Sequence, residues 1–138
     1  LSACLVTLDV DCGVDAERLG GRGNLQAVAA RMFADSELET LSVLNGQQYQ
    51  QQFFTFWTLR EAYCKALGTG LGFSKKDYAF DVADDSRIAI RFDSPRDNGQ
   101  GEYWQFNLLR PAVEHLVAVA VRTDGFAGKA VIQKYIVP

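Results

Sequence analysis

The strongest pattern of hydrophobic and polar positions covers residues 53–72, FFTFWTLREAYCKALGTGLG. Hydrophobic residues recur there at the three- and four-residue spacing of a helix, so one row of side chains is predicted to face a core. The members of this row are Phe56, Leu59, Tyr63, Ala66 and Leu67. A second row, Trp57, Glu61 and Lys65, repeats every four residues along a neighbouring face. Gly68 is predicted to end the helix in the left-handed conformation.

Upstream of this helix, the chain alternates loosely between hydrophobic and polar residues and then becomes rich in glycine. Leu1–Val14 is predicted to be the first strand, with Val6, Leu8 and Val10 on one of its faces. Arg18–Asn24 is predicted to be a flexible loop, because its GGRG does not match a phosphate-binding loop.

Two short helices are predicted between this loop and the central helix. Residues 25–33 have helical spacing. Ser36 is predicted to cap a second helix, with Glu39 as its capping-box partner. The Asn-Gly pair at 45–46 would end that helix, and the glutamine-rich segment 47–52 leads into the central helix.

After the central helix, the hydrophobic period changes from that of a helix to that of strands. Residues 78–92 are predicted to form a hairpin, and Tyr103–Leu109 a third strand that Arg110-Pro111 interrupts. His115–Arg122 would be a fourth strand covered on both faces, and Ala130–Val137 an edge strand or a tail. The predicted fold class is therefore α+β, an antiparallel sheet packed against two or three helices.

Length and composition indicate one globular domain, residues 1–138, with a formal net charge of −3. Nucleic acid is not an expected partner, because the chain is mildly acidic and has no run of Lys or Arg. Cys4, Cys12 and Cys64 form no CxxC motif, which is typical of reduced thiols in the cytoplasm. No hydrophobic run reaches the roughly 18–20 residues that span a bilayer, so no membrane contact is expected. His115, the only histidine, is predicted to be structural.

Asp15 and Glu17 are candidate metal ligands. If the first strand continues through them, both side chains point to the same face, about 7 Å apart between Cα atoms. Two neighbouring buried carboxylates repel each other unless a cation lies between them, and their oxygens suit Mg²⁺, or Mn²⁺ as an alternative. The other interpretation is that the strand has already ended and both residues are solvated loop acids.

Glu61 and Lys65 also have two interpretations. They are four residues apart on the central helix, where a carboxylate and an ammonium form an ion pair worth about 0.3–0.5 kcal/mol. Alternatively, both side chains face a ligand that carries a metal ion and phosphate. The helix alone does not decide between the two.

The segments Gly13–Glu17 (GVDAE) and Trp57–Lys65 (WTLREAYCK), with 46 residues from Asp15 to Glu61, resemble the two-part signature of the 4′-phosphopantetheinyl transferases. Arg60 occupies a position that more often holds Lys. The ARMFADSELETL stretch, the GTGL exit from the helix and the HLVAVAV strand are similar as well. The chain is most like the C-terminal half of the two-domain, surfactin-synthetase-activating type, which is one half of a pseudo-dimeric transferase fold.

This resemblance implies transfer of the 4′-phosphopantetheine group from coenzyme A to a serine of an acyl or peptidyl carrier protein. It implies that Asp15, Glu17 and Glu61 hold Mg²⁺ on the pyrophosphate of coenzyme A and that Lys65 contacts phosphate. Glu61 is either a metal ligand or the base that takes the serine proton. A divalent ion and a fixed ammonium would stabilise the charge that builds on the phosphate oxygens.

One feature departs from the two-domain pattern, because the first half that supplies coenzyme A-binding residues is not part of this sequence. The chain is therefore expected either to lack an N-terminal half or to assemble with copies of itself as a homo-oligomer. The alternative function is a non-catalytic, transferase-like module that binds coenzyme A or a carrier protein. A purely structural interpretation keeps Glu61 and Lys65 as a helix ion pair.

Overall fold

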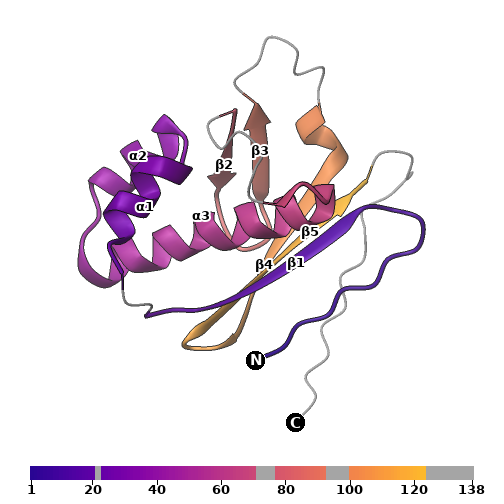
Figure 1. The fold of residues 1–138 in the computed structure, drawn as a ribbon, viewed down its shortest axis with the longest axis horizontal. Coiled ribbons are helices and arrows are strands. Elements are labelled where there is room, and N and C mark those ends of the chain that lie inside the picture. Colours follow the sequence, from indigo (N-terminus) through magenta and orange to yellow (C-terminus); the bar gives the residue numbers. More distant parts are fainter. Residues whose placement is uncertain (21–22, 71–76, 93–99, 124–138) are drawn as a thin grey trace.

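The computed structural model describes residues 1–20, 23–70, 77–92 and 100–123 (Figure 1). The elements are β1 (Cys12–Arg18), α1 (Leu25–Met32), α2 (Asp35–Ser42), α3 (Gly46–Leu67), β2 (Tyr78–Val82), β3 (Ile88–Phe92), the 3₁₀ turn η2 (Gln100–Tyr103), β4 (Trp104–Ala112) and β5 (His115–Arg122). None of the helices in this described part is long and apolar enough to cross a membrane.

The strands form two antiparallel sheets, which confirms the predicted α+β class. One sheet has the order β1-β5-β4, and the other is the β2–β3 hairpin. The central strand β5 pairs with β1 so that Asp15 lies opposite Ala118, and residues Leu116–Val121 are all buried. The prediction that this strand is covered on both faces is therefore correct.

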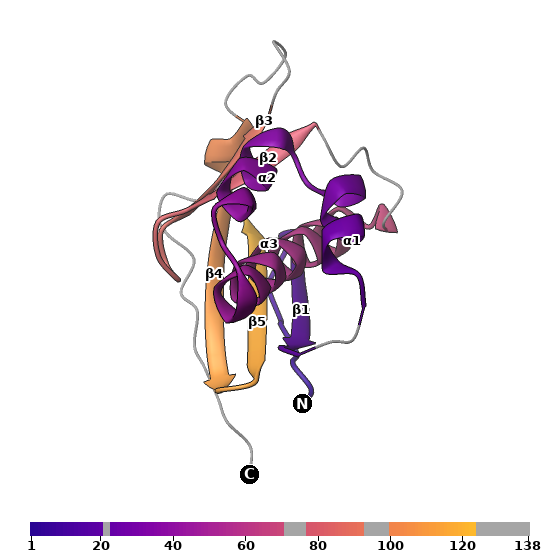
Figure 2. The same ribbon diagram turned by 90° about the vertical axis from the view of Figure 1, so that its left-hand side faces the viewer.

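Helix α3 crosses one face of the three-stranded sheet, and α1 and α2 lie on the side of α3 that faces away from this sheet (Figures 1 and 2). The predicted hydrophobic row faces the core, where Phe56 and Leu59 are 2% and 0% exposed. The ring of Tyr63 makes edge-on contacts with rings from the hairpin and β4, among them Trp104 at 4.9 Å between centroids. Gly68 ends α3 with φ 67°, the left-handed conformation that the sequence predicts.

Gly13 allows β1 to touch the backbone of α3. A Cβ atom at this position would lie 2.0 Å from the carbonyl oxygen of Ala62 and 2.6 Å from the backbone nitrogen of Ala66. Only glycine fits so close an approach of strand and helix. The residues that follow in β1 are thereby held directly against α3.

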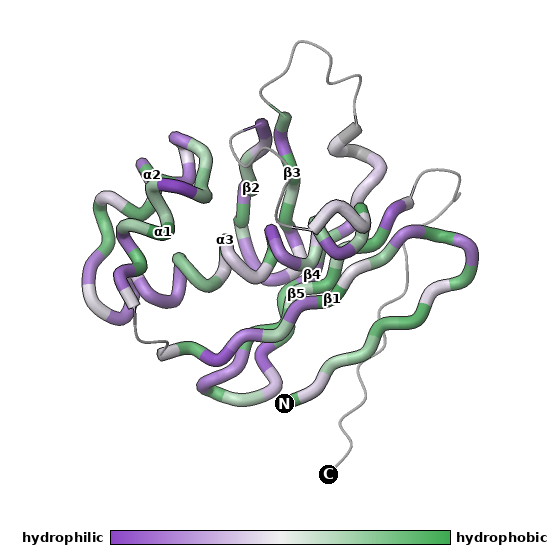
Figure 3. Tube along the Cα trace, viewed as in Figure 1, coloured by the Kyte–Doolittle hydropathy of each residue, from purple (hydrophilic) through white to green (hydrophobic). Residues whose placement is uncertain are grey.

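The prediction for the first strand is wrong in its position. The strand starts at Cys12, and residues 1–11 form no strand although they alternate. Val6 and Leu8 are 85% and 81% exposed, and Figure 3 shows this segment as largely hydrophobic. Asp9 has φ 57°, a left-handed conformation that interrupts an extended chain. Alternation alone does not reveal which residues find a partner strand.

The helix boundaries also differ from the prediction in two places. The N-cap of α2 is Ala34 rather than Ser36, and Glu37 rather than Glu39 accepts the hydrogen bond from the N-cap backbone, at 3.0 Å. The Asn-Gly pair at 45–46 starts α3 instead of ending α2, so the glutamine-rich segment is helical. This agrees with the good intrinsic helix propensity of glutamine.

In the C-terminal part, the hairpin and the fourth strand are confirmed, and one predicted strand end is wrong. Strand β4 continues through Arg110-Pro111 to Ala112, with a register shift between Leu109 and Ala112. Among the described residues β4 is an edge strand that pairs with β5, so a proline without an N–H is tolerated there. The predicted segment Ala130–Val137 lies outside the described residues.

Candidate active site

The face of β1 that touches α3 carries the two candidate carboxylates. Gly13, Asp15 and Glu17 alternate along the strand, so all three point toward the helix. The prediction that the strand continues through these residues is confirmed, and the interpretation of Asp15 and Glu17 as loop acids is wrong.

Asp15 contacts Lys65 of α3. The Nζ atom of Lys65 lies 2.8 Å from Oδ1 of Asp15, and the two side chains are 52% and 10% exposed, respectively. The other oxygen, Oδ2 of Asp15, is buried and has no hydrogen-bond partner within the described part of the chain. A buried carboxylate oxygen without a donor is costly, so this position favours a cation.

Glu17 is the next residue after Asp15 on this face of β1, and Trp57 of α3 contacts it. The indole Nε1 of Trp57 donates a hydrogen bond of 2.9 Å to Oε1 of Glu17, and its ring stacks on Phe53. Burial raises the pKa of the Glu17 carboxyl above its usual value of 4.5 and outweighs the hydrogen bond from Trp57, which lowers it. The nearby charge of Asp15 raises this pKa further, and that of Lys65 lowers it. Two carboxylates thus sit in a partly desolvated place that is short of positive charge.

Glu61 belongs to the same row of α3. It is half-buried and lies four residues from Trp57 and four from Lys65, the residues that contact Glu17 and Asp15. The helix therefore places Glu61 between the two contacts that join it to β1. In the ranges that the structure describes, no three carboxylate, imidazole or thiol groups are already gathered into a metal site.

The donor set nevertheless fits a divalent cation. All the available ligands are carboxylate oxygens, which suit Mg²⁺ or Mn²⁺ and not zinc. Asp15, Glu17 and Glu61 bring three negative charges and Lys65 brings one positive charge, so a dication would balance the group. The unpartnered oxygen of Asp15 and the raised pKa of Glu17 both indicate a place where such an ion is favoured.

The sequence did not reveal the hydrogen bond from Trp57 to Glu17. It also missed a buried ion pair between Glu37 of α2 and Arg60 of α3, with 2.5 Å between Nη2 and Oε2. The only sequence signal for Glu37 is its position at the start of a helix, where a glutamate commonly caps the backbone. Arg60 lies in the segment that resembles the transferase signature, but that resemblance did not indicate its partner.

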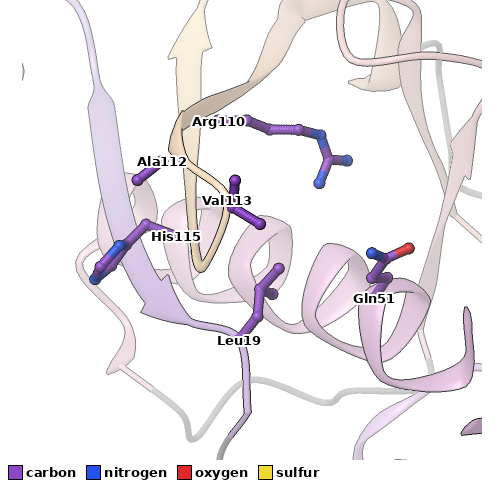
Figure 4. Close-up of a pocket in the computed structure, with 6 residues that line it drawn as sticks. All are labelled: Leu19, Gln51, Arg110, Ala112, Val113 and His115. Carbon is purple, nitrogen blue, oxygen red and sulfur yellow. The ribbon is translucent and has the colours of Figure 1, made fainter. Parts of the chain in front are cut away.

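A cavity of about 450 Å³ lies near the turn between β4 and β5. Its lining residues are Leu19, Gln51, Arg110, Ala112, Val113 and His115 (Figure 4). Arg110 is already paired with Asp85 through two hydrogen bonds of 3.0 Å. His115 stands at the start of β5, opposite Arg18.

Comparison with known proteins identifies one family. Residues 11–120 match the model of the 4′-phosphopantetheinyl transferase superfamily. The chain is 31% identical over 129 residues to the 4′-phosphopantetheinyl transferase HetI of Nostoc, covering 94% of this chain and 51% of that protein. It is also 31% identical over 124 residues to the mouse L-aminoadipate-semialdehyde dehydrogenase-phosphopantetheinyl transferase, covering 83% and 40%. The chain thus spans about half, or less, of the length of these relatives.

Solved structures share the fold. The holo-[acyl-carrier-protein] synthase of Thermotoga maritima superposes with a TM-score of 0.62 and 24% identity, covering 82% of this chain and 63% of that chain. A holo-(acyl-carrier-protein) synthase of Bacillus anthracis, solved in complex with coenzyme A (3′,5′-ADP), gives 0.63 and 20%, covering 82% and 96%. At these identities the likeness concerns the fold.

Proposed function

Because the chain belongs to the 4′-phosphopantetheinyl transferase superfamily, we propose that it transfers the 4′-phosphopantetheine group of coenzyme A to a serine of an acyl or peptidyl carrier protein. The reaction breaks the pyrophosphate bond of coenzyme A, joins the phosphopantetheine phosphate to the serine oxygen and releases 3′,5′-ADP.

One observation carries this proposal. The carboxylates of Asp15 and Glu17 face the helix row that contains Glu61 and Lys65, and an oxygen of Asp15 is buried there without a partner. A group of this kind binds a cation that in turn holds phosphate, which a structural ion pair does not require.

Asp15, Glu17 and Glu61 would hold Mg²⁺, with Mn²⁺ as the alternative ion. When bound, the ion would neutralise charge on the pyrophosphate. The ammonium of Lys65 is half-exposed and therefore accessible to a phosphate of coenzyme A, where its fixed charge favours the negative transition state. Glu61 serves either as a third ligand or as the base that accepts the serine proton.

The rest of the binding site would come from a second unit. We propose that this chain is completed either by an N-terminal half, as in the two-domain, surfactin-synthetase-activating branch, or by a second copy of itself. The relatives' greater length and the match to a synthase of similar size are consistent with either arrangement. Solution mass with and without coenzyme A and Mg²⁺ distinguishes the two.

Site variants test the reaction. Asp15→Asn and Glu61→Gln should each reduce labelling of an apo carrier protein by fluorescent coenzyme A at least 100-fold, because each removes a charge that the transition state requires. Asp81→Asn is the matched control, since Asp81 is an exposed acid of β2 that pairs with Arg91. Wild-type turnover in either site variant would refute the assignment.

The second candidate function is a module that binds coenzyme A or a carrier protein without turnover. It keeps the same carboxylate and ammonium groups, so geometry alone favours neither. Calorimetry combined with an assay for 3′,5′-ADP separates the two, because a module binds its ligand and releases no 3′,5′-ADP.

A further inference from the structure

A buried ion pair lies behind the candidate active site. The guanidinium of Arg60 in α3 contacts the carboxylate of Glu37 in α2, with Nη2 and Nε at 2.5 and 3.2 Å from Oε2. The side chains are 5% and 1% exposed, respectively. Burying two charges is expensive, and an apolar pair of the same volume is often as stable. Stability alone therefore does not explain why charged residues stand here.

The pair connects three elements. Glu37 also accepts hydrogen bonds from the backbone nitrogens of Ala34, at 3.0 Å, and Phe80 of β2, at 2.9 Å. Arg60 donates a further bond of 2.9 Å to the carbonyl oxygen of Tyr78, and its guanidinium lies 4.5 Å from the centroid of the Tyr78 ring. A planar guanidinium with fixed donors makes these contacts in one orientation only. The clamp (Glu37 and Arg60) consequently sets how α3 is rotated about its own axis.

The rotation of α3 determines where the active-site row points. Arg60 directly precedes Glu61, and successive helical residues are about 100° apart around the axis. On the β1 side the helix touches Gly13, but this backbone contact acts on Ala62 and Ala66 and holds no polar group of the row. The hydrogen bonds of the clamp therefore restrain the direction of α3 next to Glu61, in addition to the bonds from Trp57 to Glu17 and from Lys65 to Asp15.

We propose that Glu37 and Arg60 are positioning residues, which orient α3 so that Trp57, Glu61 and Lys65 meet the carboxylates of β1. The catalytic consequence rests on the proposed transferase function, whereas the geometric one does not. A misplacement of about 1 Å at reacting groups costs on the order of 100-fold in rate. The clamp would thus act on turnover without touching a substrate.

The test uses the indole of Trp57, whose N–H is bonded to Glu17, as a reporter. In a Trp104→Phe background, the remaining indole N–H resonance reports on this contact in the protein without any ligand. The decisive variant is Glu37→Leu combined with Arg60→Met, which removes both charges and keeps the volume, so that it is expected to fold. It should shift the indole resonance and lower kcat for carrier labelling about 10- to 100-fold, with a smaller change in KM for coenzyme A.

Two further variants and a control complete the experiment. Arg60→Lys keeps the charge facing Glu37 but lacks the planar fork, so it should show a smaller shift of the resonance and a smaller loss of kcat than the double variant. Glu37→Gln keeps the shape of the side chain, and its indole resonance and kcat should fall between those of the wild type and those of the double variant. Ile90→Val removes one methyl group from the buried hairpin and should leave both readouts unchanged.

The outcomes separate the two proposals. If the folded double variant or Glu37→Gln keeps the wild-type resonance and kcat, the positioning role is wrong. If the wild-type protein labels no carrier protein, the transferase proposal fails, and the indole resonance alone still decides whether the clamp sets the row.

Discussion

Gly13→Ala should damage both the fold and the site, because it adds one methyl group where β1 touches α3. The new Cβ would lie 2.0 Å from the carbonyl oxygen of Ala62, while ordinary contacts begin at 3.4 Å. The atoms that it meets belong to the helix backbone and cannot rotate away as a side chain would. Strand and helix must therefore separate by about 1.4 Å.

This separation of strand and helix lowers the stability of the fold and breaks two hydrogen bonds of the site. Overpacking a core costs about 1–3 kcal/mol, and a backbone contact lies at the upper end of this range. The bonds from Lys65 to Asp15 and from Trp57 to Glu17, now 2.8 and 2.9 Å, would lengthen to about 4 Å and be lost. We expect a loss of about 3 kcal/mol in the free energy of unfolding, or about 10 °C in Tm for a chain of this size.

Thermal and urea unfolding followed by circular dichroism measure this loss, and Gly23→Ala is the matched control. Gly23 has no atom within 4 Å of its expected Cβ position and no left-handed φ, so the control should change stability by less than about 0.5 kcal/mol. If Gly13→Ala melts within about 2 °C of the wild type, the close approach does not constrain the structure.

Two smaller predictions concern single carboxylates. The pKa of Glu17 is higher in the folded than in the unfolded state. Above a pH of about 4.5 the folded state therefore holds this proton more tightly than the unfolded state, and the free energy of unfolding declines as the pH rises through the folded-state pKa. Glu17→Gln keeps an acceptor for Trp57 and should remove this decline in a series of Tm measurements; an identical pH profile would contradict the shift. Asp84 accepts hydrogen bonds from the backbone nitrogens of Ser86 and Arg87, at 2.9 and 2.8 Å. Asp84→Ala should therefore speed amide hydrogen exchange at both residues, and unchanged exchange rates would show that the turn does not need the carboxylate.

The central helix and the strands that follow it could be predicted because local pattern and tertiary environment agree there. The hydrophobic row of α3 packs on a sheet whose own strands alternate, so each period indicates a buried face. Where a tertiary contact decides, local pattern is insufficient. The start of α2 depends on the contact of Glu37 with Arg60, 23 residues away, and not on the serine that best fits a capping box.

Edges of the sheet show the same limit. Pro111 looks like the end of a strand, but it lies in β4 at an irregularity in the pairing with β5, where a missing N–H is tolerated. The alternating residues Val6 and Leu8 look like a strand but have no partner strand in the part of the chain that the structure describes. Partner availability is a property of the assembled sheet and is not encoded in the alternation of one segment.

The periods of the strand and of the helix predicted the two halves of the candidate site, and the resemblance implied that these halves meet. A strand places every second residue on one face, and a helix aligns every fourth residue, so Asp15 and Glu17 can face the row of Glu61 and Lys65 only if Gly13 lets the two backbones touch. The glycine, the acids and the helix row are therefore one geometric requirement, spread over two segments. The clamp behind them obeys no such period, since Glu37 and Arg60 meet through the packing of three elements. This is why a sequence pattern indicates which groups share one face, while only the structure reveals which residues orient them.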